Sequence, residues 1–277
     1  MQVFKRGEIV DAVEAIECVA CGKAGMHFVR TIRSRRRPAN LPLYFCDKCE
    51  SFAMPSDFHQ QIKDPARAIQ FHKNILDRNI KWSRGLVDWL TRSDFPTDGL
   101  HEIGCGNGAL LKVAQDAGIR PAVGFEMNPH MAYFAQQLDV DIRPALWSAQ
   151  VDAPPARLLA ALSVFEHIND PRPLAREMAE YGRRHKAFAI INTPIIRDTK
   201  WRYVFTPYER GSPFDAADSH VLYFSPEGLP SLLKSAGAVA VRRKRVGGWN
   251  VHVCAFTVMS AAFLDSDNID WSPVAGL

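Results

Sequence analysis

The stretch HEIGCGNGALL, from His101 to Leu111, constrains the fold of this chain more than any other part. A short apolar segment runs into glycines at positions 104, 106 and 108, and a helical pattern begins at Leu110. Glycines at such a turn let a ligand approach the backbone, and the helix start offers N–H groups without intrahelical partners. The pattern is typical of the first strand, loop and helix of a doubly wound sheet. We therefore expect a Rossmann-like α/β fold.

The next apolar run, AVGFEM, predicts the second strand of this sheet and carries Glu126 at its end. A carboxylate at this place accepts hydrogen bonds from ribose hydroxyls in nucleotide-binding folds. Gly104, Gly106 and Ala109 satisfy the dinucleotide pattern G-x-G-x-x-G/A, so the loop alone leaves NAD open as a ligand. A Walker A loop is excluded, because no Gly-Lys-Ser/Thr follows the glycines.

Glu102 stands two residues before the first glycine and extends the pattern to E-x-G-x-G-x-G. This string resembles motif I of the class I S-adenosylmethionine-dependent methyltransferases. In that family the first acidic residue and the glycine backbone handle the methionine moiety, and a second acidic residue, matched here by Glu126, takes the ribose. The resemblance implies S-adenosylmethionine as the cofactor and a set of residues at the strand ends that hold it: Glu102, Gly104, Cys105, Gly106, Glu126, Met127 and Ser163.

The resemblance covers residues 60 to 260. The run LSVFEHINDPRPLAREM, residues 162 to 178, is similar to the family's fourth strand and to the Glu-His and Asp-Pro signature of its small-molecule and sugar enzymes. KAFAIINTP resembles the fifth strand, and residues 219 to 239 resemble a segment in which a histidine precedes a helix that begins at Ser-Pro-Glu. VAVRRKRV and NVHVCAFTVM predict the antiparallel strand pair that ends the fold. The acidic residue with which the family often meets adenine stays unassigned.

Three residues are candidates for the chemistry of transfer. A methyl group on a sulfonium is already electrophilic, so the protein has to align a nucleophile and remove its proton. His167 follows the predicted fourth strand at the ligand-binding edge of the sheet, where an imidazole accepts a proton at neutral pH. Glu166 would orient this imidazole or help to bind a divalent metal ion; the alternative is a Glu-His pair that only fixes its loop. His220, the second candidate base, ends a lid-like insertion near 195–220.

Four cysteines form two C-x2-C pairs near the N-terminus, Cys18 with Cys21 and Cys46 with Cys49. MHFVRTI and LPLYF predict a hairpin that brings the pairs together. Four thiolates make a closed tetrahedral zinc site, so we expect structural and not catalytic zinc, with reduced cysteines or disulfides as the alternative. The chain then divides into a zinc-ribbon-like module, residues 1–59, and a class I methyltransferase domain with preceding helices, residues 60–277.

The acceptor is predicted only as a class. The downstream motifs favour a sugar, nucleotide sugar or surface glycan, and the four-cysteine module resembles that of some deoxysugar C-methyltransferases. RNA is the alternative partner, with arginines of the hairpin turn gripping phosphates, although a net charge of +4 is modest for a nucleic-acid partner. A third hypothesis is a module that docks a partner protein beside a domain that binds cofactor without turnover. No apolar run is long enough for a signal peptide or a membrane span, so we expect a cytoplasmic protein.

Overall fold

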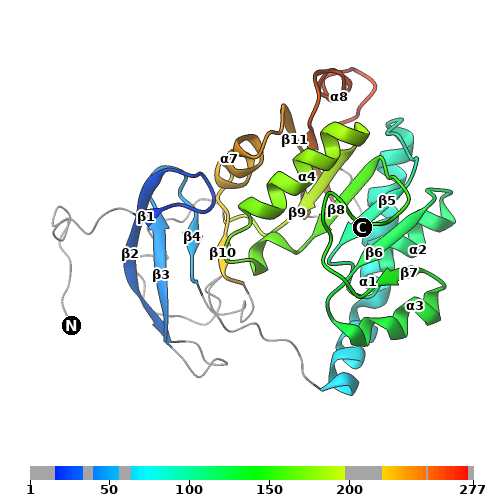
Figure 1. Cartoon of the computed structure of the whole chain (residues 1–277), viewed down its shortest axis with the longest axis horizontal. Helices are drawn as coiled ribbons and strands as arrows, with labels where there is room; N and C mark the ends of the chain where they lie inside the picture. The colour runs from blue at the N-terminus through cyan, green and yellow to red at the C-terminus, as the bar shows by residue number, and fades with distance from the viewer. Residues whose placement is uncertain (1–15, 34–39, 56–63, 197–219, 248, 274–277) are drawn as a thin grey trace.

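A computed structural model describes residues 16–33, 40–55, 64–196, 220–247 and 249–273 (Figure 1). Two β-sheets form its framework, a small one built mainly from the N-terminal residues and a seven-stranded one that carries most of the helices. Within these ranges no helix is both long and apolar enough to cross a membrane. The predicted lid-like insertion lies outside the described residues apart from its ends, and so do the arginines at positions 35 to 37.

The large sheet has the strand order β11-β12-β9-β8-β5-β6-β7. The strands β7, β6, β5, β8 and β9 are parallel, whereas β12 runs antiparallel to β9 and β11 runs antiparallel to β12. The predicted Rossmann-like sheet with an antiparallel last strand pair is thus confirmed. Its strands are β5 (Leu100–Ile103), β6 (Ala122–Phe125), β7 (Asp141–Arg143), β8 (Leu158–Leu162), β9 (Phe188–Asn192), β11 (Ala240–Val246) and β12 (Trp249–Ala255).

Helices cover both faces of this sheet, which explains why its central strands are apolar throughout. One face packs against α4 (Arg172–His185) and α7 (Gly228–Ser235). The opposite face packs against α1 (Pro65–Arg92), α2 (Ala109–Asp116) and α8 (Val258–Leu264), while the short α3 (Ala132–Leu138) lies beside β7. The chain turns from β7 back to the other side of β5 to form β8. This reversal of strand order leaves a crevice at the carboxyl ends of β5 and β8, where ligands bind in such folds.

The predicted helices before the sheet are a single helix, α1. It begins after Asp64, whose side chain accepts hydrogen bonds from the N–H groups of Ala66 and Arg67, and Pro65 occupies the first turn, where its missing N–H costs nothing. The fully buried apolar residues of α1 are concentrated in its last turns, where Leu86 and Leu90 pack on the sheet. Its earlier turns reach past the sheet edge toward the crevice.

Three predicted boundaries differ from the structure. The fourth strand, β8, ends at Leu162, where the predicted segment began, because Ser163 adopts a left-handed φ of 56°. The last strand ends at Ala255 and not beyond, because Thr257 caps α8 by accepting from the N–H of Ser260. Helix α7 starts at Gly228, later than predicted, although Ser225 still caps it by accepting from the Gly228 N–H at 2.9 Å.

The small sheet has the order β1-β2-β3-β4-β10 and contains the predicted hairpin. Its strands are β1 (Ile16–Glu17), β2 (Ala24–Arg33), β3 (Asn40–Cys46), β4 (Phe52–Ala53) and β10 (Leu222–Tyr223). The last of these comes from the far half of the chain and pairs Leu222 with Ala53 and Tyr223 with Phe52. In Figure 1, β10 is the strand of the small sheet that lies nearest the large sheet, so main-chain pairing joins the N-terminal strands to a later part of the chain.

Candidate active site

A cavity of about 580 Å³ opens at the carboxyl ends of β5, β6 and β8. The glycine loop and Glu126 line one part of it, and His167 and His220 line another. The predicted cofactor loop and the predicted catalytic histidines therefore share one space, although up to 116 positions separate them along the chain (Gly104 to His220). This is the place where the reversal of strand order predicts a ligand.

The glycine loop is held open by hydrogen bonds to the second strand. Gly104 has a left-handed φ of 66° and donates its N–H to the carbonyl of Phe125 at 2.8 Å. A Cβ atom at this position would lie 2.8 Å from Val164 Cγ2, so only glycine fits without displacing the segment after β8. The loop residue Gly106, with a φ of 53°, donates to Glu126 Oε2 at 3.1 Å. The loop backbone and the second predicted acidic residue thus form one unit.

Glu126 is fixed at both carboxylate oxygens. Its Oε1 accepts from the N–H of Asn128 at 2.8 Å while Oε2 accepts from Gly106, and its own N–H donates to the Arg143 carbonyl. Two backbone donors hold the carboxylate at the end of β6 and leave the remaining lone pairs of its oxygens available toward the cavity. This is the arrangement expected of a residue that accepts hydrogen bonds from vicinal hydroxyls.

Glu102 is buried at the end of β5, with 5% of its surface exposed. Its burial, and then the nearby charge of Glu126, raise the pKa of the Glu102 carboxyl well above its usual range. Within the described residues, Glu102 Oε2 has no hydrogen-bond partner. Glu102 is buried and Glu126 is half-buried beside the glycine loop, and two neighbouring carboxyl groups there favour a ligand that brings positive charge over the pyrophosphate of a dinucleotide.

Helix α1 forms a wall of the cavity that the sequence reading did not assign to the site. Phe71, Ile75, Arg78 and Trp82 lie on one face of this helix, and all four line the cavity. The helix is tied to the loop, because Asn107 Nδ2 donates to the carbonyl of His72 at 3.1 Å. The i, i+4, i+7 spacing of these side chains was visible in the sequence. However, the same spacing describes any helix face packed on a core.

Three further contacts form the side of the cavity near β12. Trp82 Nε1 donates to the Val246 carbonyl at 3.1 Å, and its ring meets Trp249 edge to face with centroids 6.4 Å apart. Asn192, at the end of β9, lines the cavity and donates to the Asn250 carbonyl at 2.7 Å. The cavity thus carries aromatic and amide side chains next to the acidic pair.

Glu166, His167 and His220 come together at the acceptor end of the cavity. The left-handed Ser163 ends β8 and turns the chain into a short 3-10 helix, Phe165–His167. The rings of His167 and His220 meet edge to face with centroids 4.7 Å apart, and Glu166 Oε1 lies 4.0 Å from His220 Nε2. One ligand atom from each of the three residues lies within 4.8 Å of the other two. Glu166 therefore faces His220 as well as its sequence neighbour.

The carboxyl of Glu166 is buried, with 1% of the side chain exposed. Burial raises its pKa to about 7, and its own backbone N–H and the nearby Thr193 and Ser163 hydroxyls counter part of that rise. Neither carboxylate oxygen has a partner in hydrogen-bonding geometry among the described residues. A buried carboxyl in this state is costly unless a charge or a donor is brought to it.

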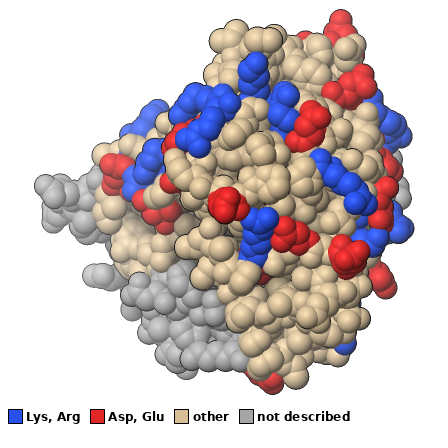
Figure 2. All heavy atoms as spheres, turned by 45° about the vertical axis from the view of Figure 1, so that its right-hand side comes forward, with Lys and Arg blue, Asp and Glu red and all other residues tan. Residues whose placement is uncertain are grey.

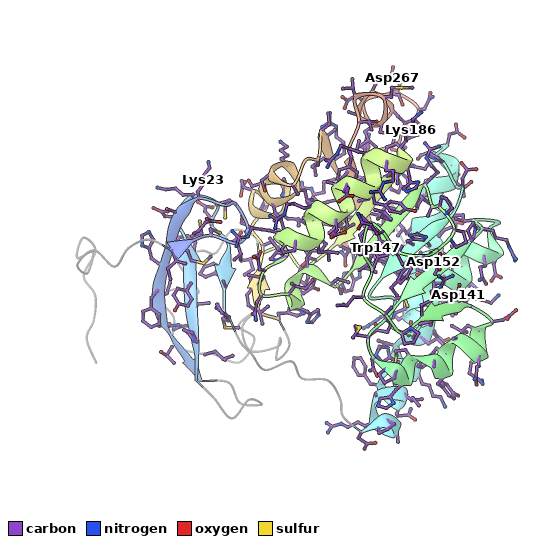
Figure 3. All side chains as sticks on the ribbon, viewed as in Figure 1. Lys23, Asp141, Trp147, Asp152, Lys186 and Asp267 are labelled. Atoms are coloured by element: carbon purple, nitrogen blue, oxygen red, sulfur yellow. The ribbon has the colours of Figure 1, made fainter. Side chains whose placement is uncertain are left out.

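Other predicted residues take different places. Cys105 and Ser163 line the cavity, and burial raises the pKa of the Cys105 thiol strongly, so it stays protonated. Met127 is 50% exposed and lies outside the cavity lining. Near the third strand, where an adenine contact was sought, Arg143 pairs with Asp141 at 3.1 Å. Trp147 is buried under α4 and donates to His101 Nδ1 at 3.2 Å, so it does not reach the cavity (Figure 3).

The four cysteines of the N-terminal pairs form a second cluster, next to the turn that Lys23 marks in Figure 3. The Sγ atoms of Cys18 and Cys49 are 3.7 Å apart, and those of Cys21 and Cys46 are 3.8 Å apart. Four sulfurs about 2.3 Å from one zinc ion lie about 3.8 Å from one another, whereas a disulfide requires about 2.05 Å. The arrangement fits a tetrahedral metal and excludes disulfides between these pairs.

Comparison with known proteins places the larger part of the chain. A family model described as a methyltransferase domain matches residues 81–242, which is more than half of the sequence. No curated protein matches the sequence significantly. The solved structures that resemble the chain share only 12 to 15% of its residues in the three comparisons below, so they speak for the fold.

Human N-acetylserotonin methyltransferase, in complex with SAM, has a TM-score of 0.54 and 14% identity, and the match covers 73% of this chain and 60% of the human one. The chain thus spans less than two thirds of that relative. The sugar N-methyltransferase KedS8 from Streptoalloteichus has a TM-score of 0.51 and 15% identity, and the match covers 73% of this chain and 96% of KedS8. DesVI from Streptomyces venezuelae has a TM-score of 0.50 and 12% identity, and the match covers 72% of this chain and 100% of DesVI.

Proposed function

This chain belongs to the methyltransferase-domain family whose model it matches, and on that premise we propose that it transfers the methyl group of S-adenosylmethionine to a small-molecule acceptor. The acceptor class that we favour is a sugar, a nucleotide sugar or a surface glycan. One observation carries the proposal. A single cavity joins Glu102, Glu126 and the glycine loop to the Glu166, His167 and His220 cluster.

The charge of the cavity supports S-adenosylmethionine over a dinucleotide. At neutral pH its sulfonium and ammonium groups carry two positive charges and its carboxylate one negative charge. Glu102 and Glu126 stand beside the glycine loop where a dinucleotide would place its pyrophosphate. In our proposal the Glu126 carboxylate, aligned by two backbone N–H groups, accepts from the ribose hydroxyls, and the loop backbone with Glu102 receives the methionine end.

The proposed transfer needs little chemistry from the protein. The sulfonium supplies an activated methyl group, so the protein has to hold the acceptor in line and receive its proton. His167 and His220 line the cavity and are the proposed proton acceptors, because an imidazole changes charge near neutral pH. Glu166, 4.0 Å from His220, would stabilise the imidazolium that forms.

The lining of the cavity favours a sugar-like acceptor. Trp82 and Trp249 offer aromatic surface, and Asn79 and Asn192 offer amide donors and acceptors, which together suit a ring with hydroxyl groups on its edges. The likeness to a sugar N-methyltransferase is a fold-level analogy that agrees with this choice. The atom that is methylated follows from neither observation.

The alternative acceptor is RNA, held by the arginines of the hairpin turn. On the face shown in Figure 2, Lys and Arg side chains are interspersed with Asp and Glu and do not form one continuous basic surface. A phosphate-binding surface is expected to be broader and of one sign. RNA binding that weakens steeply with salt would favour this alternative over a small acceptor.

We also propose that the four-cysteine cluster holds a structural zinc ion. The proposal rests on the sulfur separations, which match a tetrahedral site, and on the knuckle turns: the N–H of Gly22 donates to the Cys18 carbonyl and the N–H of Glu50 to the Cys46 carbonyl. The division into residues 1–59 and 60–277 stays a proposal of the same kind. Metal analysis of the purified protein, with a Cys18→Ser, Cys21→Ser double variant as the control, tests the zinc.

The transfer itself is tested with labelled S-adenosylmethionine and panels of nucleotide sugars, glycans and RNA. Calorimetry should detect S-adenosylmethionine and its demethylated product and no nicotinamide dinucleotide. Binding of the dinucleotide alone would refute the proposal. Cofactor binding without transfer to any acceptor class would favour the docking hypothesis instead. Single His167→Ala and His220→Ala variants that transfer at the wild-type rate would remove both catalytic assignments.

A further inference from the structure

We propose that Glu166, His167 and His220 bind a divalent cation of the Mn²⁺ type at the acceptor end of the cavity. The binding itself needs no assumption about methyl transfer, whereas the role that we give the ion rests on the proposed function. Two imidazoles and one carboxylate form the donor set found in open facial sites for first-row divalent metals. The four cysteines offer only soft thiolates, so the two clusters would select different metals.

The geometry of the cluster comes close to that of a three-ligand metal site. The ligand atoms lie within 4.8 Å of one another, and the measured pair, Glu166 Oε1 and His220 Nε2, is 4.0 Å apart. Nitrogen and oxygen ligands about 2.1 Å from one ion lie roughly 3 to 4.2 Å apart, depending on the angle between them. In a facial site all three ligand pairs lie about 3 Å apart, so Glu166 and His220 have to approach by about 1 Å and the widest pair by at most about 1.8 Å, which rotation of two half-buried imidazoles can supply.

The burial of Glu166 is an independent indication that the cluster suits a cation. Only 1% of the Glu166 side chain is exposed, and among the described residues neither carboxylate oxygen has a partner in hydrogen-bonding geometry. Its backbone is committed, because the Glu166 carbonyl accepts from the N–H of Val221 at 2.7 Å. A carboxylate buried to this degree costs free energy unless a positive charge shares its position, and the His220 imidazole, 4.0 Å away, lies beyond hydrogen-bond distance. A cation held by the two histidines supplies that charge.

Each ligand is placed by main-chain structure. Glu166 and His167 belong to the 3-10 helix that the left-handed Ser163 starts, and His220 lies two residues before β10. The bond between Val221 and Glu166 joins the two segments at the level of the ligands. Because Met54 donates its N–H to the Val221 carbonyl at 2.7 Å, the N-terminal module also supports the position of His220.

Three protein ligands leave open coordination positions that face the methyl donor's space, since His167 and His220 line the cavity. An acceptor with two adjacent oxygens, such as a vicinal diol, would fill two of them. With both imidazoles bound to the ion, neither accepts the proton, so this role of the ion replaces the imidazole-base role of the proposed function. Coordination lowers the pKa of the acceptor hydroxyl, so its proton leaves to solvent. The oxygen then forms a bond to the methyl carbon, the bond from that carbon to sulfur breaks, and the sulfur keeps the electron pair as a neutral thioether. The ion itself is neither oxidised nor reduced.

The experiment titrates Mn²⁺ into the full-length, zinc-loaded protein and follows the loss of the free-ion signal by electron paramagnetic resonance. Mn²⁺ is the probe because a hard ion avoids the four thiolates. We expect one bound ion, and at least about tenfold weaker binding in His220→Ala and in Glu166→Gln. His130→Ala is the control, because His130 lies outside the cavity lining, in the short helix Pro129–Met131. Far-ultraviolet circular dichroism and zinc content establish that each variant is folded.

The outcomes distinguish failure of the metal site from failure of the proposed methyl transfer. Equal Mn²⁺ binding by the wild type, His220→Ala and Glu166→Gln, or no binding by any of them, overturns the metal site. If transfer nonetheless falls in both variants, the imidazole-base role of the proposed function stands alone. Mn²⁺ binding that depends on these residues, without methyl transfer to any acceptor, supports the metal site and contradicts the proposed function. If Glu166→Gln does not fold, His167→Ala replaces it with the same expected weakening.

Discussion

Ser225 offers a sharp test of how the N-terminal module is attached to the catalytic part. The residue follows β10 and is 2% exposed. Its Oγ donates to the Cys49 carbonyl, between the cysteine cluster and β4, and accepts from the N–H of Gly228 at 2.9 Å. Its own N–H donates to Ser51 Oγ at 3.2 Å. One hydroxyl thus joins the loop that contains Cys49 to the start of α7. We expect Ser225→Ala to destabilise both segments.

The magnitude follows from what each group loses. The Cys49 carbonyl loses a donor in a buried place, which costs about 1–3 kcal/mol. The Gly228 N–H keeps a weaker bond of 3.2 Å to the Ser225 carbonyl, so only the cap is lost there, about 1 kcal/mol. Together Ser225→Ala is expected to lower the free energy of unfolding by about 2–4 kcal/mol.

The assay is urea unfolding followed by fluorescence and circular dichroism, with zinc content matched between proteins. Ser235→Ala is the matched control, because Ser235 lies in the same helix and its Oγ bonds only the Leu232 carbonyl, at 2.8 Å. We expect this control to lose less than about 0.5 kcal/mol. Equal losses in the two variants would refute the reasoning. So would a Ser225→Ala protein that unfolds at the wild-type urea concentration.

Three further predictions concern the cavity and the sheet. Glu126→Gln should weaken S-adenosylmethionine binding roughly 10- to 100-fold in calorimetry, because charge-assisted hydrogen bonds of about 1.5–3 kcal/mol are lost. Wild-type affinity in this variant would remove Glu126 from the site. Glu180→Gln, at a partly exposed side chain, serves as the control. Gly104→Ala should weaken cofactor binding because its Cβ meets Val164. Gly118→Ala also strains a left-handed backbone, at a φ of 84°, but its Cβ would enter open space, so it should only lower the free energy of unfolding by about 1 kcal/mol. Equal losses of cofactor affinity in the two variants would contradict this. Burial lowers the pKa of His252 to about 4 from 6.5, so the unfolded chain takes up the proton first as the pH falls. His252 should therefore cost the fold about 3 kcal/mol between pH 6.5 and 4, and a His252→Gln protein with an unchanged pH slope in urea unfolding would disprove it.

The local parts of the site could be predicted because each depends on neighbouring residues. The glycines at 104 and 106 adopt left-handed φ angles that glycine favours, and Glu126 ends the strand beside them. Likewise the C-x2-C spacing places two thiolates on one turn, and the hairpin strands between the pairs alternate in a way that the sequence shows. In each case the chemistry and the geometry are set within a few residues.

Other parts were misplaced or missed because packing decides them. The end of β8 is set by a left-handed Ser163, a conformation that a serine rarely adopts and that composition does not announce. Trp82 reads as an ordinary apolar helix residue, yet its contact with Trp249 makes it part of the cavity. Trp147, which follows the third strand, is buried and donates to His101, a contact that no local pattern in the sequence indicates.

The sequence by itself determined that this chain builds a Rossmann-like sheet with a glycine loop, a carboxylate at the end of the next strand and two pairs of cysteines, because short-range stereochemistry fixes all of these. Only the tertiary structure decided that His220 meets Glu166 and that β10 completes the N-terminal sheet. Residues that far apart along the chain are brought together by strand pairing and core burial, and no local pattern records which distant strand edge a segment such as Leu222–Tyr223 will find.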